Sequence, residues 1–126
     1  MDDFTENKII KIFNEKILSP ILYMVENGDI IDLICFCDMD ITERDIYEAE
    51  DAICLEIGRP VEIIDIREFD RSDRIDIITN AKLIHSEGEL IENIFRQSML
   101  EDFCKMISER EGAMLRYNEN KTPYLQ

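Results

Sequence analysis

Residues 21–37 read ILYMVENGDIIDLICFC, and this stretch decides the fold. Its first part, 21–25, predicts a short buried strand, and 30–37 predicts a second strand that is apolar on both faces apart from Asp32. The intervening Glu-Asn-Gly-Asp turn is too short to join parallel strands, so the two strands form an antiparallel pair. A strand that is apolar on both faces belongs in the centre of a sheet covered on both sides.

Helical spacing of apolar residues flanks this pair. On the N-terminal side it predicts a helix over 4–18, with Thr5 as N-cap and an end at the Ser-Pro step that follows. On the C-terminal side, Thr42-x-x-Asp45 opens a helix that runs to about Ile57, where Gly58 is a suitable residue to terminate it.

The rest of the chain continues this alternation. VEIIDI (61–66) predicts a third strand, AKLIHS (81–86) a fourth, and a short helix over 72–80 begins at Ser72 or Asp73. From about Gly88 to Tyr117 the spacing predicts one long amphipathic helix, or a pair broken at Gly112. The tail NENKTPYLQ is polar, and we expect it to be loosely held.

These elements predict a single domain over residues 1–126 of the α+β (mixed α/β) class. The length of 126 residues suits one domain, and there is no linker, internal repeat or Ser/Gly-rich tract. We therefore expect a mixed sheet of about four strands, helices packed on it, and a long C-terminal helix.

The charge of the chain limits its partners. Its 14 basic and 29 acidic residues give a formal net charge of −15, which excludes bulk attraction to nucleic acid or to an anionic membrane. The acidic N-terminus and the lack of an 18-residue apolar run predict a cytoplasmic protein. Cys35 and Cys37 could form a redox or metal pair, but their apolar context favours reduced core thiols.

The order of these segments resembles the minimal nucleotidyltransferase (MNT) family. IIDLICF, a helix, GRPVEIIDI, a short helix, AKLIHS and the closing RYNENKTPYLQ match the family's D-[IL]-D-L strand, its G-x-x-V-D-L strand and its C-terminal helix, over about residues 17–126. The resemblance implies a nucleotidyltransferase-like fold. It also implies descent from enzymes that use two metal ions to clamp the attacking and leaving oxygens.

The sequence departs from the family at the positions that carry the chemistry. The family's Gly-Ser turn, which would hold the triphosphate, is missing after residue 25 together with about ten residues. The first aspartate of the D-x-D pair corresponds to Ile30, the second survives as Asp32, and the third acidic position is Glu62. Asp32 and Glu62 are therefore vestigial catalytic candidates that would bind Mg²⁺ weakly at best. Whether Asp29 or Asp65 contributes to the site stays open.

Two functions follow from the resemblance, besides a purely structural role of the same fold within a larger assembly. The first is a degenerate nucleotidyltransferase without transferase activity, with no cofactor, that acts through protein–protein interaction, such as an antitoxin with a helical HEPN-type partner. The alternative is an active enzyme that transfers AMP from ATP to a protein or small molecule with Mg²⁺. The acidic stretch 38–56 would suit a basic partner.

The C-terminal helix also predicts self-association, most simply as a homodimer. A helix that packs on one sheet face needs only about a 100° apolar stripe. This helix carries more apolar residues than one stripe holds: Leu90, Ile91, Ile94, Phe95, Met99, Leu100, Phe103, Cys104, Met106 and Ile107.

Overall fold

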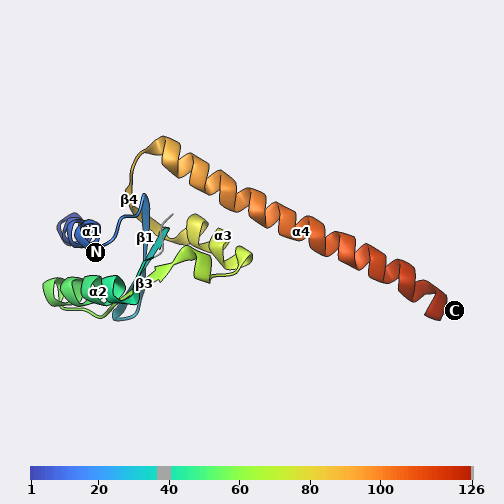
Figure 1. Cartoon of the computed structure of the whole chain (residues 1–126), viewed down its shortest axis with the longest axis horizontal. Helices are drawn as coiled ribbons and strands as arrows, with labels where there is room; N and C mark the ends of the chain where they lie inside the picture. Colours follow the sequence, from blue (N-terminus) through green and yellow to red (C-terminus); the bar gives the residue numbers. More distant parts are fainter. Residues whose placement is uncertain (37–40, 126) are drawn as a thin grey trace.

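The computed structural model describes residues 1–36 and 41–125, with side chains to residue 113. Its elements are α1 (Asp3–Lys16), β1 (Ile21–Asn27), β2 (Ile30–Phe36), α2 (Glu43–Ile57), β3 (Val61–Asp65), the 3₁₀ turn η1 (Ile66–Glu68), α3 (Arg71–Asn80), β4 (Lys82–Ser86) and α4 (Glu89–Leu125). The single mixed sheet lies between α1 and α2 on one face and α3 and α4 on the other (Figure 1). The predicted fold class is confirmed.

The sheet is built outward from the hairpin. The strand order is β3-β2-β1-β4, with β1 antiparallel to both of its neighbours and β2 parallel to β3. The hairpin pair occupies the two central positions, as the apolar character of both its strands predicts.

Alternate residues of the central strands form two hydrophobic clusters, one on each face. Leu22, Met24, Leu33 and Cys35 pack with Ile9, Phe13 and Ile53 beneath α1 and α2. Ile21, Tyr23 and Ile34 pack with Ile78, Phe95 and Met99 beneath α3 and α4. Every even-numbered residue of β2 therefore belongs to the face that α3 and α4 cover.

Two helices begin earlier than the sequence predicts. The N-cap of α1 is Asp2, whose side chain accepts a hydrogen bond from the Thr5 N–H at 2.7 Å, so Thr5 itself is helical. The N-cap of α3 is Asp70, which accepts from the Asp73 N–H at 2.8 Å. In each case an aspartate three residues upstream replaces the predicted cap, because a carboxylate accepts this bond as well as a hydroxyl does. The end of α2 at Gly58, with φ 72°, is as predicted.

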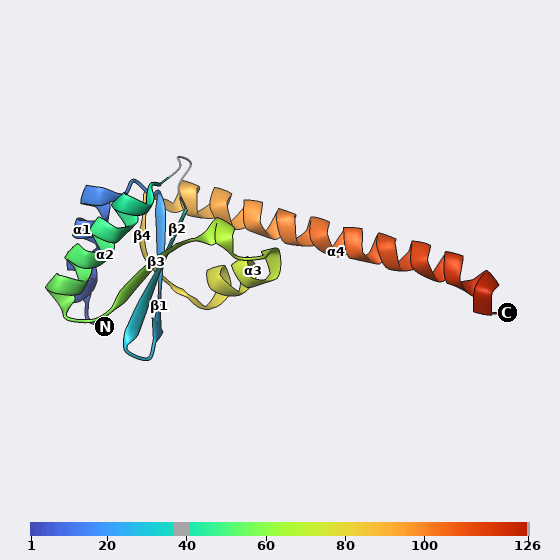
Figure 2. The same cartoon turned by 60° about the horizontal axis from the view of Figure 1, so that its bottom comes forward.

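The C-terminal helix differs more from the expectation. Helix α4 has 37 residues without a break at Gly112, and the tail predicted to be loosely held is helical to Leu125. A single glycine costs a helix only about 1 kcal/mol, which the 23 helical residues before Gly112 and the 13 after it offset. The helix projects far beyond the sheet (Figure 2). No helix in the described part of the chain is apolar over enough length to cross a membrane.

Candidate functional site

Asp32 and Glu62 lie directly opposite each other on adjacent strands. The parallel register of β2 and β3 pairs Asp32 with Glu62, and the antiparallel register of β1 and β2 pairs Asp32 with Val25. Residues paired in this way project from the same face of a sheet, with Cα atoms about 5 Å apart. The register therefore places the two carboxylates on one face of the sheet. Asp32 is partly buried and Glu62 is exposed.

The face that carries these acids also carries an exposed aliphatic side chain. Ile30 lies two residues before Asp32, so it projects from the same face, and it is 43% exposed. An acid at this position would be accessible to solvent and to a ligand, whereas isoleucine offers no ligand atom.

The connection between β1 and β2 is a two-residue turn. The paired residues Asn27 and Ile30 flank Gly28 and Asp29 alone, and Gly28 has φ 65°. A positive φ at the first turn residue is the requirement of a type II′ hairpin. Arg59 donates from Nη2 to the carbonyl oxygen of Gly28 at 3.1 Å and from Nε to that of Asp29 at 3.3 Å. One guanidinium thus holds both turn carbonyls, and a loop of two residues is too short to supply the row of successive amides that forms a phosphate-binding loop.

A pocket of about 280 Å³ adjoins Asp32 on the α3 side of the sheet. Asp76 and Asn80 of α3 line it together with the apolar side chains of Val25, Ile34, Phe69, Ile77 and Ala81. The Asn80 side chain donates to Asp76 at 2.6 Å. Sequence reasoning missed Asp76, because this residue falls within an ordinary amphipathic stretch.

The acids present do not form a site for the two metal ions of nucleotidyl transfer. Within the described residues, no three His, Cys, Asp or Glu side chains gather in a group that could hold a metal ion. Asp29 lies in the hairpin turn, and Asp65 pairs with Arg67 at 2.7 Å. Since Asp32 and Glu62 supply only two protein ligands, the residues do not fit that metal centre.

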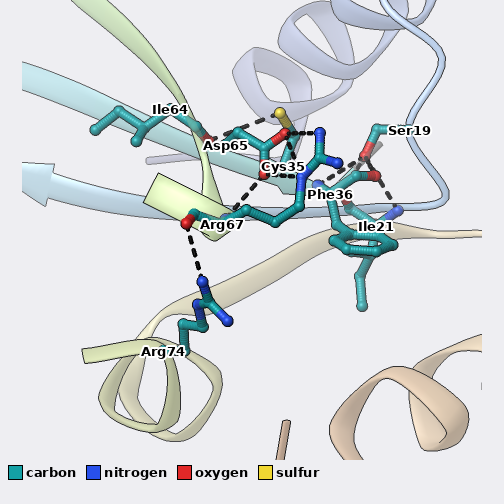
Figure 3. A network of polar contacts seen from close by, with 8 residues as sticks. All are labelled: Ser19, Ile21, Cys35, Phe36, Ile64, Asp65, Arg67 and Arg74. Carbon is teal, nitrogen blue, oxygen red and sulfur yellow. Dashed lines mark hydrogen bonds and ion pairs between the residues drawn. The ribbon is translucent and has the colours of Figure 1, made fainter. Parts of the chain in front are cut away.

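The best-connected polar groups lie at the opposite end of β2 (Figure 3). The Ser19 hydroxyl donates toward the carbonyls of Ile21 and Phe36, at 2.6 and 2.8 Å, and accepts from the Phe36 N–H at 3.2 Å. Arg67 pairs with Asp65, and Arg74 donates to the Arg67 carbonyl at 2.9 Å. These contacts satisfy strand ends and hold η1 against α3, which is a structural role.

We compared the sequence and the fold with those of known proteins. No protein-family model and no curated protein matches the sequence. Among solved structures, a chain of the toxin–antitoxin complex MntA–HepT matches with a TM-score of 0.73 at 18% identity, over 90% of this chain and 96% of that one. A chain of the tri-AMPylated Shewanella oneidensis HEPN toxin in complex with MNT antitoxin matches with a TM-score of 0.74 at 17% identity, over the same shares.

The chain has the minimal nucleotidyltransferase fold. A third match, to a toxin–antitoxin structure with AMP-PNP, has a TM-score of 0.70 at 16% identity and covers 86% of this chain and 94% of that one. The fold predicted from the sequence resemblance is confirmed, including the long C-terminal helix. In this chain, two residues close the central hairpin of the fold, and Asp32 and Glu62 lie beside Ile30.

Proposed function

We propose that this protein is a degenerate nucleotidyltransferase without transferase activity that acts through protein–protein interaction, as an antitoxin-like component with a helical HEPN-type partner. The observation that carries the loss of activity is the two-residue turn between β1 and β2. Nucleotidyl transfer needs donors for the triphosphate and carboxylates for two metal ions. Here only two residues connect β1 and β2, and Ile30 stands beside the two remaining acids.

The fold relationship supports the choice of partner. Structures that share this fold over nine-tenths of the chain come from complexes of MNT antitoxins with HEPN toxins. The proposal includes the cytoplasmic location and the homodimer that the sequence predicts.

The outer face of α2 has the properties of a surface for a basic partner. Tyr47 and Leu55, two turns apart, are 64% and 86% exposed, and Asp51 lies between them. From Glu43 to Ile57 the helix has six acidic residues and one basic residue, Arg44, which pairs with Glu48 at 3.0 Å. Lys8 of α1 also pairs with Glu56 at 3.2 Å, but the acids of α2 still outnumber these bases. Exposed apolar side chains among an excess of acids favour a partner segment that carries lysine or arginine.

One observation favours the alternative, an active enzyme that transfers AMP from ATP. Asp32 and Glu62 keep the cross-strand pairing that a carboxylate site requires, beside a pocket of about 280 Å³. This reading requires the triphosphate to be held by groups other than the β1–β2 turn.

A transfer assay distinguishes the inactive protein from an active enzyme. The full chain is incubated with labelled ATP, Mg²⁺ or Mn²⁺, and an extract of the native cell as a source of acceptors. We expect no labelled product from the parent protein. We also expect none from Ile30→Asp, because that variant restores an acid but not the phosphate-binding turn. Label transfer that disappears in Asp32→Asn would establish the enzyme and overturn the proposal.

The partner is tested by purifying the tagged full chain from its native cell. We expect a helical HEPN-type protein in a fixed ratio to the bait, and we expect Tyr47→Lys with Leu55→Lys to reduce its recovery. Phe4→Lys, an exposed aromatic position on α1, is the matched control. Recovery of the bait alone under gentle, low-salt conditions would contradict the antitoxin-like role.

A further inference from the structure

Helix α4 presents two apolar seams that lie side by side along its length. The inner seam packs on the domain: Phe95 and Met99 are buried, and Asp102 and Glu109 pair with Arg74 and Arg71 of α3 at 3.8 and 3.6 Å. The outer seam follows Leu100, Phe103 and Ile107, at steps of three and four residues, with Cys104 beside them. Among these, Leu100 is 45% and Ile107 is 37% exposed, and Cys104 is exposed.

The charge distribution favours a second copy as the occupant of the outer seam. Residues 1–88 hold 22 acidic and nine basic residues, a net of −13, whereas residues 89–126 hold seven acidic and five basic residues, a net of −2. Two copies that approach through their domains therefore repel each other strongly. Two copies that approach through α4 bring together the nearly neutral part of each chain.

We propose that two copies of this chain pair through the outer seams of α4 in antiparallel orientation, with the two-fold axis between residues 103 and 104. In this register Leu100 lies opposite Ile107 of the second copy, and Phe103 lies opposite Cys104 of the second copy. The proposal deepens the homodimer included above by naming its surface and register.

Charge at the ends of the seam selects the antiparallel orientation. Arg96 and Glu111 flank the outer seam at equal distances from its centre. The antiparallel register sets Arg96 of each copy against Glu111 of the other, and a parallel register sets each residue against its own equivalent. Antiparallel pairing also places the positive end of each helix dipole beside the negative end of the other, which is the favourable arrangement.

The first test measures association of the full chain by sedimentation equilibrium at 0.15 M salt. We expect the parent to have twice the monomer mass at about 100 µM. We expect Leu100→Glu or Ile107→Glu to weaken the dimer at least tenfold, because each places a carboxylate in the apolar seam. Leu90→Glu is the matched control, since it adds the same charge on the same helix at a residue that is 72% exposed and off the seam. A monomeric parent, or equal weakening by Leu90→Glu, would overturn the proposal.

The second test measures orientation without disturbing the fold. In a Cys104→Ser background, Leu100→Cys and Ile107→Cys chains carrying different tags are mixed and mildly oxidised, with Cys104→Ser alone as the control for the other thiols. We expect a disulfide between the two different chains. In the proposed register, Leu100→Cys chains should not link to each other, because seven residues of rise separate the equivalent positions by about 10 Å. A self-linked Leu100→Cys dimer would show a parallel pair. If both tests fail but the HEPN-type partner is still recovered with the tagged chain, only the proposed dimer is refuted, and the proposed function stands.

Discussion

Ile30 shows how much of a site can depend on one residue. It occupies the face that Asp32 and Glu62 share, and it is exposed although it is aliphatic. An exposed isoleucine adds nothing to the core, and it cannot ligate a cation. Strand alternation predicts that Ile30 and Asp32 share a face, but the position of Glu62 opposite Asp32 could be expected only from the family resemblance, because alternation does not say which strands pair or in which register.

Ser19 gives a prediction at the same scale. Its buried hydroxyl accepts a hydrogen bond from the Phe36 N–H and donates toward the carbonyls of Ile21 and Phe36. Ser19→Ala leaves these groups without their partner, so we expect the free energy of unfolding to fall by about 1–3 kcal/mol. Urea unfolding measures the change. Ser108→Ala on exposed α4 is the control and should alter stability by less than about 0.5 kcal/mol. Equal stability of Ser19→Ala and the parent would contradict this role.

The residue contacts that sequence could predict are the local ones. The ion pair of Asp65 and Arg67 joins residues that are two apart in the chain, so their proximity is visible in the sequence. The bonds of Ser19 join residues 17 apart. Such bonds depend on the sheet register, which a Ser-Pro step cannot show, since the step only marks the end of a helix.

At the scale of elements, the cap of α1 makes a pH-dependent prediction. The hydrogen bond from Thr5 lowers the pKa of the Asp2 carboxyl below its usual value. A carboxyl with a lowered folded-state pKa stabilises the fold above its unfolded value, near pH 4, and this contribution disappears as the pH falls through the folded value. We expect Asp2→Ala to lower Tm by a few degrees at pH 7 and by less at pH 3.

The matched variant for this cap is Asp2→Asn. Its amide oxygen accepts the same bond without titrating, so its Tm at pH 7 should stay close to that of the parent. Thermal melts at pH 7, 5 and 3 test the cap. A pH-independent difference between Asp2→Ala and the parent would show that the carboxylate charge is not involved.

Element boundaries were predictable to within a few residues, and the misplaced starts of α1 and α3 share one cause. Asp2 and Asp70 cap their helices, yet each precedes another residue that could serve, so composition could not choose between them. At Gly112 the sequence left a break and a continuous helix as alternatives. Propensity alone could not decide this, because the cost of one glycine is small beside the length of α4.

At the scale of the whole molecule, the net charge makes a prediction about salt. A formal charge of −15 on 126 residues places like charges close together on the folded surface. Raising the ionic strength from 0.01 to 0.15 M shortens the Debye length from about 30 to about 8 Å. We therefore expect Tm to rise over this range, by the same amount in sodium and potassium chloride. A Tm that is unchanged or falls would show that attractive pairs dominate the surface.

The arrangement of the domain was predictable because the hairpin fixes it. A four-residue turn between two apolar strands forces antiparallel pairing, and the helix between 30–36 and 61–65 provides the crossover that a parallel pair requires. The partner of the last strand, β4, was not predictable. Its pairing with β1 across a register shift depends on which edge of the sheet is left free.

The two-residue turn between β1 and β2 also bears on the order in which the chain folds. A hairpin closed by so short a loop forms within about 1–10 µs and requires little loop-closure entropy. Because its strands become the two central strands, β3 and β4 add later to an existing template. A longer loop at this point would add a closure cost that rises slowly with its length. The short connection therefore makes the hairpin a local and early step, on which the strands that are more distant in the chain can assemble.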